Sequence, residues 1–394
     1  MSRNNQPQYN LTNNQLSSVP KMEHQLINIP SSNQASFGSS FLININEMSM
    51  IHEIILQYNM SSITGLSTLA NYPQYVPGYF FFTRIDIFVG SNCIDSIYPL
   101  QQFVNSQIFN DDCDRWFISN GCGAYNSASQ RATMASTSNS YFIPIRSFFN
   151  QSHMSLINNN HNVSLRIFND TLTNCVIQSS SQTGTAVASI ISVNALVRCS
   201  RPSMEQNALN INNLNIRPNH YLFNETRYMP VPVSSGLLSC TNILNGITGS
   251  VSYLFFTLRY SNALTGLGAF TYLPIASFAI LGADGSNICG GGVISSATNL
   301  TVMNRYNTLG SYTSETALGT LNNGANVYIF PFCCDIITQS QTGQQFGGGR
   351  VFTGNEQLIV NFTSALTSAA QLDVFASVNG IIEQTTLYIK KKTL

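Results

Sequence analysis

Charged side chains are scarce in this chain of 394 residues. Lys, Arg, Asp and Glu make up 9% of it, whereas roughly 25% is usual in soluble domains. Seventeen basic residues balance seventeen acidic ones, so the formal net charge is zero. A broad basic surface that could neutralise phosphates is therefore missing, which argues against bulk or sequence-specific binding of nucleic acid.

The polar character of the chain comes from Asn, Ser, Thr and Gln instead. One explanation is an AT-rich genome, which inflates Asn and Ile. Another is a surface made to pack against neighbours, because few ions then need to be desolvated. The two explanations are compatible. With 43% hydrophobic residues, the chain can bury sizeable cores, and its length allows two or three domains.

Targeting signals and long apolar runs are also missing. Residues 1–14 are polar and hold no signal-peptide core, and no apolar run approaches the roughly 18 residues of a membrane-spanning helix. Cysteine occurs nine times, an odd number, and never as a C-x-x-C pair. These features predict a protein made in the cytosol, with thiols that are mostly reduced and packed inside.

Groups that carry catalysis are few and scattered. The chain lacks an H-E-x-x-H motif, a nucleophile elbow and a dinucleotide fingerprint, and no Gly-Lys-Ser/Thr follows its glycine-rich segment at 290–292. Its five histidines are His24, His52, His153, His161 and His220. We therefore predict that the chain is not an enzyme and has no catalytic site, no cofactor and no metal site.

Two clusters leave a chemical alternative open. Cys113 and Cys122 could join His153 and His161 at a zinc ion, but their spacing fits no standard zinc module. The favoured interpretation is that they are ordinary loop or core residues. The adjacent cysteines at 333–334 follow an apolar strand, where neighbouring side chains point to opposite faces and make poor joint ligands.

The second cluster is acidic. Asp111, Asp112 and Asp114 lie beside Arg115 and Trp116. Paired carboxylates could serve a glycosidase or bind calcium. We favour a solvated loop that Arg115 holds in place.

Strand signals dominate beyond residue 21. Apolar and polar residues alternate in 84–89 and 163–167, which is the period of half-buried strands, whereas 251–258 is apolar on both faces and fits a strand buried on both sides. Helical spacing at 100–109 predicts one short loop helix. Turns are predicted at Pro77-Gly78, Asn245-Gly246 and Asn379-Gly380.

An internal repeat is the most informative feature of the sequence. The paired segments are 88–94 with 280–288, 141–145 with 328–332, 165–168 with 358–361, and 192–197 with 377–382. Strands resemble one another, so one match says little, but four ordered matches at nearly one offset indicate a duplicated domain. The period, about 190 residues, is too long for a solenoid and leaves room for the eight or so strands of a jelly roll.

The predicted fold class is therefore all-β: two tandem eight-stranded antiparallel jelly-roll sandwiches with a few short loop helices. Residues 1–20 are Asn- and Gln-rich and predict an extended N-terminal arm. We assign 21–200 to the first jelly roll, 201–218 to a linker and 219–394 to the second, which ends in a basic tail. Pro144 and Pro331 occupy the same place in the two copies, so each is predicted at a strand start, a bulge or a sheet edge.

This organisation resembles the double jelly-roll major capsid proteins of tailless icosahedral DNA viruses. That lineage includes adenovirus hexon and the capsid proteins of large eukaryotic DNA viruses and virophages. The segments that carry the resemblance are 27–30 followed by 41–45, as in the family's opening hairpin; 141–149, like its Y-x-P-L-x-F-F strand; and 352–358.

The resemblance implies a structural major capsid protein that forms trimeric, pseudo-hexagonal capsomers of an icosahedral shell. Its partners would be two further copies in a homotrimer, neighbouring capsomers and minor capsid proteins. It would be made in the host cytoplasm and reside in the virion. The arm and the C-terminal Lys390, Lys391 and Lys392 would face the interior, where an internal membrane is one candidate contact. From the residues alone, the lysine run is interpreted as a solvated tail.

Two other functions compete with this interpretation. A carbohydrate- or receptor-binding jelly-roll protein, such as a viral spike, would use exposed aromatic loops around Trp116, Tyr125 and Tyr312. With one Trp in the whole chain, that case is thin. A glycoside hydrolase would need a pair of acidic residues that the pattern does not supply.

Overall fold

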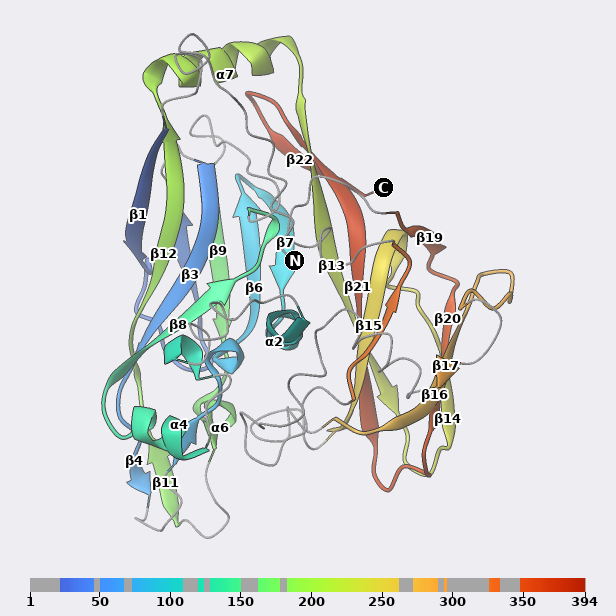
Figure 1. The fold of residues 1–394 in the computed structure, drawn as a ribbon. Coiled ribbons are helices and arrows are strands. Elements are labelled where there is room, and N and C mark those ends of the chain that lie inside the picture. The colour runs from blue at the N-terminus through green and yellow to red at the C-terminus, as the bar shows by residue number, and fades with distance from the viewer. Residues whose placement is uncertain are drawn as a thin grey trace, which may run out of the picture.

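The structure is a computed structural model in which two β-sandwiches stand side by side (Figure 1). It describes residues 22–45, 50–66, 73–108, 120–123, 128–149, 162–177, 183–261, 272–289, 294–295, 326–333 and 348–393. The predicted arm, residues 1–20, lies outside this part of the chain. Over the described residues, no helix is long and apolar enough to cross a bilayer.

The first roll consists of two four-stranded antiparallel sheets. One sheet has the order β1-β12-β3-β8, and the other has the order β2-β9-β6-β7. The strands are β1 (Met22–Pro30), β2 (Ser40–Ile45), β3 (Met50–Met60), β6 (Phe82–Val89), β7 (Asn92–Ile97), β8 (Asn139–Ile145), β9 (Val163–Asn169) and β12 (Ile190–Pro202).

The second roll repeats this arrangement strand for strand. Its sheets run β13-β21-β15-β18 and β14-β20-β16-β17, so the order of strands along the chain is the same as in the first roll. The strands are β13 (Asn219–Val233), β14 (Ser239–Ile243), β15 (Thr248–Tyr260), β16 (Ile275–Leu281), β17 (Ile294–Ser295), β18 (Tyr328–Pro331), β20 (Gln357–Phe362) and β21 (Ala370–Gln384). The predicted fold class, two eight-stranded antiparallel sandwiches, is confirmed.

Short elements decorate both rolls. The helices are η1 (Gly78–Phe80), α2 (Pro99–Ile108), α4 (Ala128–Ala135), α6 (Leu172–Cys175) and α7 (Met204–Ile216). The additional strands are β4 (Thr64–Leu66), β5 (Gln74–Tyr75), β10 (Val176–Ile177), β11 (Gly184–Val187), β19 (Arg350–Thr353) and β22 (Ile389–Thr393). The helix predicted at 100–109 is α2. The segment between the rolls, which showed no strand pattern, forms α7.

Alternation builds the two cores. In β3 the inward positions, such as Leu56 and Tyr58, are fully buried, and the residues between them are half-buried. β15 is buried on both faces, as the sequence predicted. Leu254 and Phe256 belong to the second roll's core, whereas Tyr253 and Phe255 lie in a separate cluster shared with the first roll.

The internal repeat is in register. Segments 165–168 and 358–361 fall on β9 and β20, and segments 192–197 and 377–382 fall on β12 and β21, which hold corresponding places in the two rolls. Pro144 lies in β8 and Pro331 ends β18; each of these strands is at the edge of its sheet. The missing N–H of each proline therefore leaves no central ladder incomplete, as expected.

Two local predictions are wrong. Asn379-Gly380 is not a turn but lies inside the long strand β21. A Cβ on Gly380 would come within 2.6 Å of the Phe223 ring, so the glycine is there to admit the ring of the neighbouring strand β13. Segments 27–30 and 41–45 form no hairpin either, because β1 pairs with β12 and β2 pairs with β9 in the opposite sheet.

Candidate assembly surfaces and the interface between the two rolls

A stack of aromatic rings joins the rolls. Tyr98, just before α2 of the first roll, lies 4.9 Å from Tyr228 of β13, measured between ring centroids. Tyr228 stacks on Phe375 at 4.6 Å, and Phe375 stacks on Phe255 at 4.6 Å. Leu100 of α2 packs in the same cluster. Stacked rings add to the burial of their area, so this row contributes strongly to holding the rolls together.

A buried ion pair lies beside the stack. Asp373 is fully buried, and its Oδ2 accepts a hydrogen bond from Arg259 Nε at 2.8 Å. The other carboxylate oxygen accepts hydrogen bonds from the Tyr228 hydroxyl and the Gln371 amide, both at 2.7 Å. Burial, reinforced by Asp373, raises the pKa of Tyr228 well above its usual range, so Tyr228 remains a donor. Every oxygen of the buried carboxylate is thus paired.

Three strands of the second roll also contribute side chains to the first roll's core. Phe223 of β13, Ile382 of β21 and Ile389 of β22 belong to the same buried cluster as the first roll's apolar residues. Phe223 meets Phe148 with ring centroids 6.4 Å apart. The Asn92 amide in β7 donates a 2.7 Å hydrogen bond to the Ile389 carbonyl. The C-terminal strand is therefore part of the interface.

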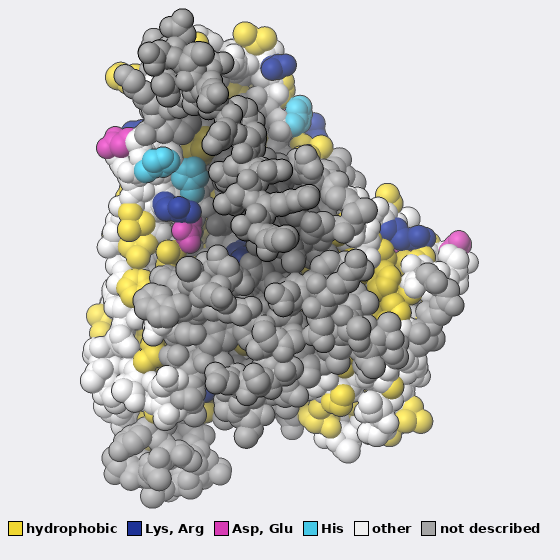
Figure 2. Space-filling view, viewed as in Figure 1, with side chains coloured by type: hydrophobic (Ala, Val, Ile, Leu, Met, Phe, Trp, Pro, Cys, Tyr) yellow, Lys and Arg dark blue, Asp and Glu magenta, His cyan; other side chains and the backbone are white. Residues whose placement is uncertain are grey.

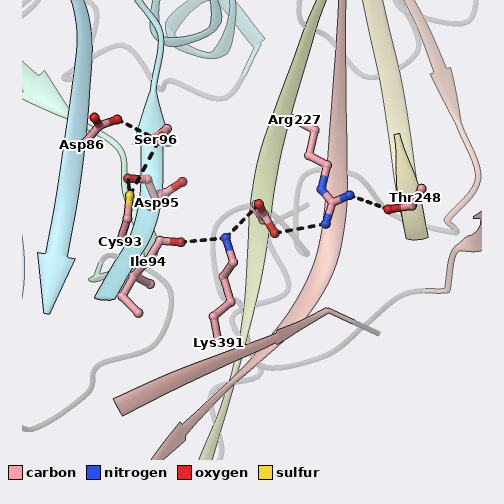
Figure 3. A network of polar contacts seen from close by, with 9 residues as sticks. Asp86, Cys93, Ile94, Asp95, Ser96, Arg227, Thr248 and Lys391 are labelled. Carbon is pink, nitrogen blue, oxygen red and sulfur yellow. Dashed lines mark hydrogen bonds and ion pairs between the residues drawn. The ribbon is translucent and has the colours of Figure 1, made fainter. Parts of the chain in front are cut away.

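Lys391 ties three strands together (Figure 3). Its Nζ donates to Glu225 Oε1 in β13 at 2.9 Å and to the Ile94 carbonyl in β7 at 3.3 Å. Arg227 approaches the second oxygen of Glu225 at 3.7 Å and donates to the Thr248 hydroxyl at 2.6 Å. A chain of polar contacts thus runs from the first roll's edge strand across the second roll's sheet.

The interpretation of the lysine run as a solvated tail is wrong. Residues 389–393 form β22, which pairs with β21. Because side chains alternate along a strand, Lys391 turns into the interface while Lys390 and Lys392 stay exposed. Lys392 also contacts Glu383 of β21.

A second buried carboxylate adjoins Lys391. Asp95 in β7 keeps only 7% of its surface exposed. Burial, followed by the nearby charge of Glu225, raises the pKa of Asp95 from 3.8 to about 7; Lys391 and the backbone amides of Ser96 and Phe148 act in the opposite direction. Lys391 thus pairs directly with Glu225, and its charge also acts on Asp95.

The histidines do not converge on one site. His24 in β1 and His52 in β3 stand on either side of β12, with ring centroids 6.1 Å apart. Both contact the buried Ser200 hydroxyl. In the second roll, His220 of β13 lies 3.4 Å from Glu383 of β21. His153 and His161 lie outside the described residues.

The remaining candidate ligands are no closer together. Cys122 is buried in the first roll's core, and Cys333 packs against the aromatic cluster between the rolls. Cys113, Cys334, Tyr125, Tyr312 and the cluster from Asp111 to Trp116 lie outside the described part. Within the described part, no group of three or more His, Cys, Asp or Glu residues could hold a metal ion.

Sequence reasoning missed the charged residues of the interface. Asp373, Arg259 and Asp95 each stand in or at the end of an apolar strand of a charge-poor chain. An isolated charge in an apolar strand requires a partner when it is buried, and that signal could have marked these positions.

The two rolls differ in what covers corresponding sheet faces. On the second roll, Ser377 and Asn379 of β21 lie on the outward side of the sheet and are 4% and 1% exposed. Asn379 is hydrogen-bonded to Ser250, Ser252 and the Gly348 carbonyl of its own roll. Their counterparts in the repeat, Ser192 and Asn194 of β12, are only half-buried, and neighbouring Ile191 is 54% exposed. We call this surface, the side of β1-β12-β3-β8 that turns away from the first core, the first-roll outer face.

No family model matches the chain, and no curated protein matches it. Solved structures do match. The PBCV-1 virus capsid aligns with TM-score 0.67 at 14% identity, over 95% of this chain and 97% of that one. The Faustovirus major capsid protein aligns with TM-score 0.68 at 8% identity, over 92% and 90%.

A virophage protein gives the same result. The Sputnik structure aligns with TM-score 0.62 at 10% identity, over 95% of this chain and 88% of that one. In each case the alignment spans both rolls, so it is the tandem arrangement that matches and not one sandwich alone. The chain therefore has the double jelly-roll fold of these viral major capsid proteins.

Proposed function

We propose that the chain is the major capsid protein of an icosahedral virus, with a structural and not a catalytic role. The observation that carries this proposal is the match of both rolls, in order, over nearly the whole length of several viral capsid proteins. A single jelly roll serves many functions, but a tandem pair with a buried interface between the rolls is a far narrower design. Its place would be the virion shell, after synthesis in the host cytoplasm.

The assembly unit we propose is a homotrimer with a pseudo-hexagonal outline. Within the chain, the aromatic cluster on the outward side of β13-β21-β15-β18 packs against the first roll. The first-roll outer face carries matching Ser and Asn residues but is only half-buried. If each roll packs on the next in the same way, the second roll of another copy covers this face. Three chains of two rolls then close a ring of six.

Further partners follow from this role. Neighbouring capsomers would surround the trimer, and minor capsid proteins or an internal membrane would contact its inner side. Residues 1–20 are proposed as an assembly arm, since they are polar and lack an apolar period. Deleting them should leave the trimer folded but impair shell assembly.

Native mass determination tests the trimer. Chains of 43.2 kDa should give a particle of about 130 kDa. Leu196→Arg on the first-roll outer face should shift it to monomer, whereas Val187→Arg, a change at the exposed strand β11, should not. A wild-type monomer at micromolar concentration would refute the trimer, and a monomer that also binds a glycan array would favour the carbohydrate-binding alternative.

A further inference from the structure

Exposed apolar side chains gather at one end of the molecule. Of the thirteen large apolar side chains exposed among the described residues, five lie in α7 or in the turn between β21 and β22. They are Met204 (94% exposed), Leu209 (54%), Ile216 (81%), Leu387 (74%) and Tyr388 (44%). Among the side chains of α7 that the structure describes, Leu214 is the buried one. Such clustering of apolar surface marks a contact site more often than scattered exposure does.

The strand register places the turn at 385–388 close to one end of α7. Asn219, which follows α7, pairs with Gln384, which precedes the turn at 385–388. The turn therefore sits beside the C-terminal end of the helix, and Figure 1 shows the tip of this hairpin next to α7. We call helix α7 and this turn the α7 end.

Basic side chains surround the apolar ones. Arg201 and Arg217 flank the helix, and Lys390 follows the turn; all three are exposed. Lys392 and His220 lie nearby, with about half of each side chain exposed, and both contact Glu383. Figure 2 shows Lys and Arg atoms beside hydrophobic atoms at this end. Among the described side chains here, Glu23 on β1 stands opposite Arg201, and Glu383 already contacts Lys392 and His220, which leaves Arg217 and Lys390 as exposed cations.

We propose that the α7 end docks on a lipid bilayer that carries anionic headgroups. The helix of 13 residues is about 20 Å long, too short to cross the roughly 30 Å apolar layer, so it would lie in the interface plane. Leu209, Ile216 and Leu387 would enter the acyl boundary, and Arg217 and Lys390 would meet the phosphates. Exposed Asn side chains between them carry no charge and would stay at headgroup level.

This inference deepens the proposed function, since it names the surface through which such a capsid protein would contact an internal membrane. The binding itself does not require a shell. It can therefore be tested on the purified full-length chain, with native mass recorded for every variant. Loss of the trimer would count against the proposed function, and loss of vesicle binding would count against the docking surface.

The test is co-flotation with vesicles of phosphatidylcholine containing phosphatidylglycerol, compared with pure phosphatidylcholine. Wild type should float with the anionic vesicles and release them at high salt. The variant Arg217→Gln with Lys390→Gln should bind on the order of twentyfold more weakly, since each basic residue contributes about fivefold. Leu209→Gln, Ile216→Gln and Leu387→Gln together should weaken binding by roughly tenfold or more.

A matched control keeps the result specific. Val187→Gln, Leu238→Gln and Val351→Gln remove three apolar side chains that are 59%, 63% and 69% exposed on other surfaces. This variant should bind vesicles like wild type. The proposal is overturned if wild type does not float with anionic vesicles, if both triple variants bind equally, or if binding ignores the lipid charge. The last two results would indicate a protein partner or nonspecific hydrophobic binding to vesicles.

Discussion

Asp95→Asn offers the sharpest test of the interface between the rolls. Asp95 is buried near the charge of Glu225, and Lys391 is the cation whose charge acts in the opposite direction on the Asp95 pKa. Asparagine has nearly the same shape but cannot ionise. The substitution therefore removes the cost of a buried negative charge without opening a cavity.

The sign and size of the effect follow from the pKa. In the unfolded chain the carboxyl titrates near 3.8, whereas in the folded chain its pKa is about 7. Folding thus takes up a proton between these values, and the free energy of unfolding falls as pH rises from about 4 to about 7. Roughly three pKa units correspond to at most ~4 kcal/mol. Because the unfolded carboxyl is already ionised at pH 5, the variant should be more stable than wild type by about 1.5 kcal/mol at pH 5 and by about 4 kcal/mol at pH 8.

Urea unfolding at fixed protein concentration measures this difference at both pH values. Carboxylates that do not interact with Asp95 are common to both proteins, so they cancel in the comparison. Glu23→Gln, which changes an exposed carboxylate of β1, serves as the control and should alter neither value. The buried charge of Asp95 does not destabilise the fold if Asp95→Asn is no more stable than wild type at pH 8, or if its gain in stability at pH 5 equals its gain at pH 8.

Three further changes probe packing at the interface, each measured by urea unfolding. Gly380→Ala places a Cβ 2.6 Å from the Phe223 ring and should cost about 1–3 kcal/mol, part of which Phe223→Leu should restore; no loss would contradict the close packing. Asp373→Asn leaves the buried Arg259 charge poorly compensated and should cost about 3–5 kcal/mol, whereas Arg259→Met with Asp373→Leu should cost less. Ile389→Ala should lower the free energy of unfolding by about 2–4 kcal/mol and speed proteolysis of β22. Unchanged cleavage would show that Ile389 does not hold β22 in the interface.

The sequence predicted the architecture because both copies follow the same local rules. Alternation marked β9 and β12 and their counterparts, and the edge prolines at 144 and 331 fit both copies equally. The prediction failed at Asn379-Gly380 because the same dipeptide can form a turn or can lie in a strand where the glycine makes room for an aromatic ring. The position of Phe223 opposite Gly380 in the neighbouring strand distinguishes the strand from the turn.

The interface itself could be predicted only in part. The two-sided apolar character of β15 showed that something covers its outer side, but not what does so. Lys391 resembled part of a solvated run because no local pattern announces that residues 389–393 return to pair with β21. Its partners, Glu225 and the Ile94 carbonyl, are 166 and 297 positions away in the chain, beyond the reach of any periodicity.

Duplication, however, provides a comparison inside the molecule that a single domain lacks. Ser192 and Ser377 stand at the same place on the same strand, yet only Ser377 is buried. The residue type and the strand are shared, so the difference in burial comes from what packs on the sheet. The outward sheet side is covered in the second roll and partly open in the first, although the side chains match. A second chain can therefore pack on the first-roll outer face as the two rolls pack on each other within one chain. Leu196→Arg, which places a charge on the first-roll outer face, tests whether a second chain packs there.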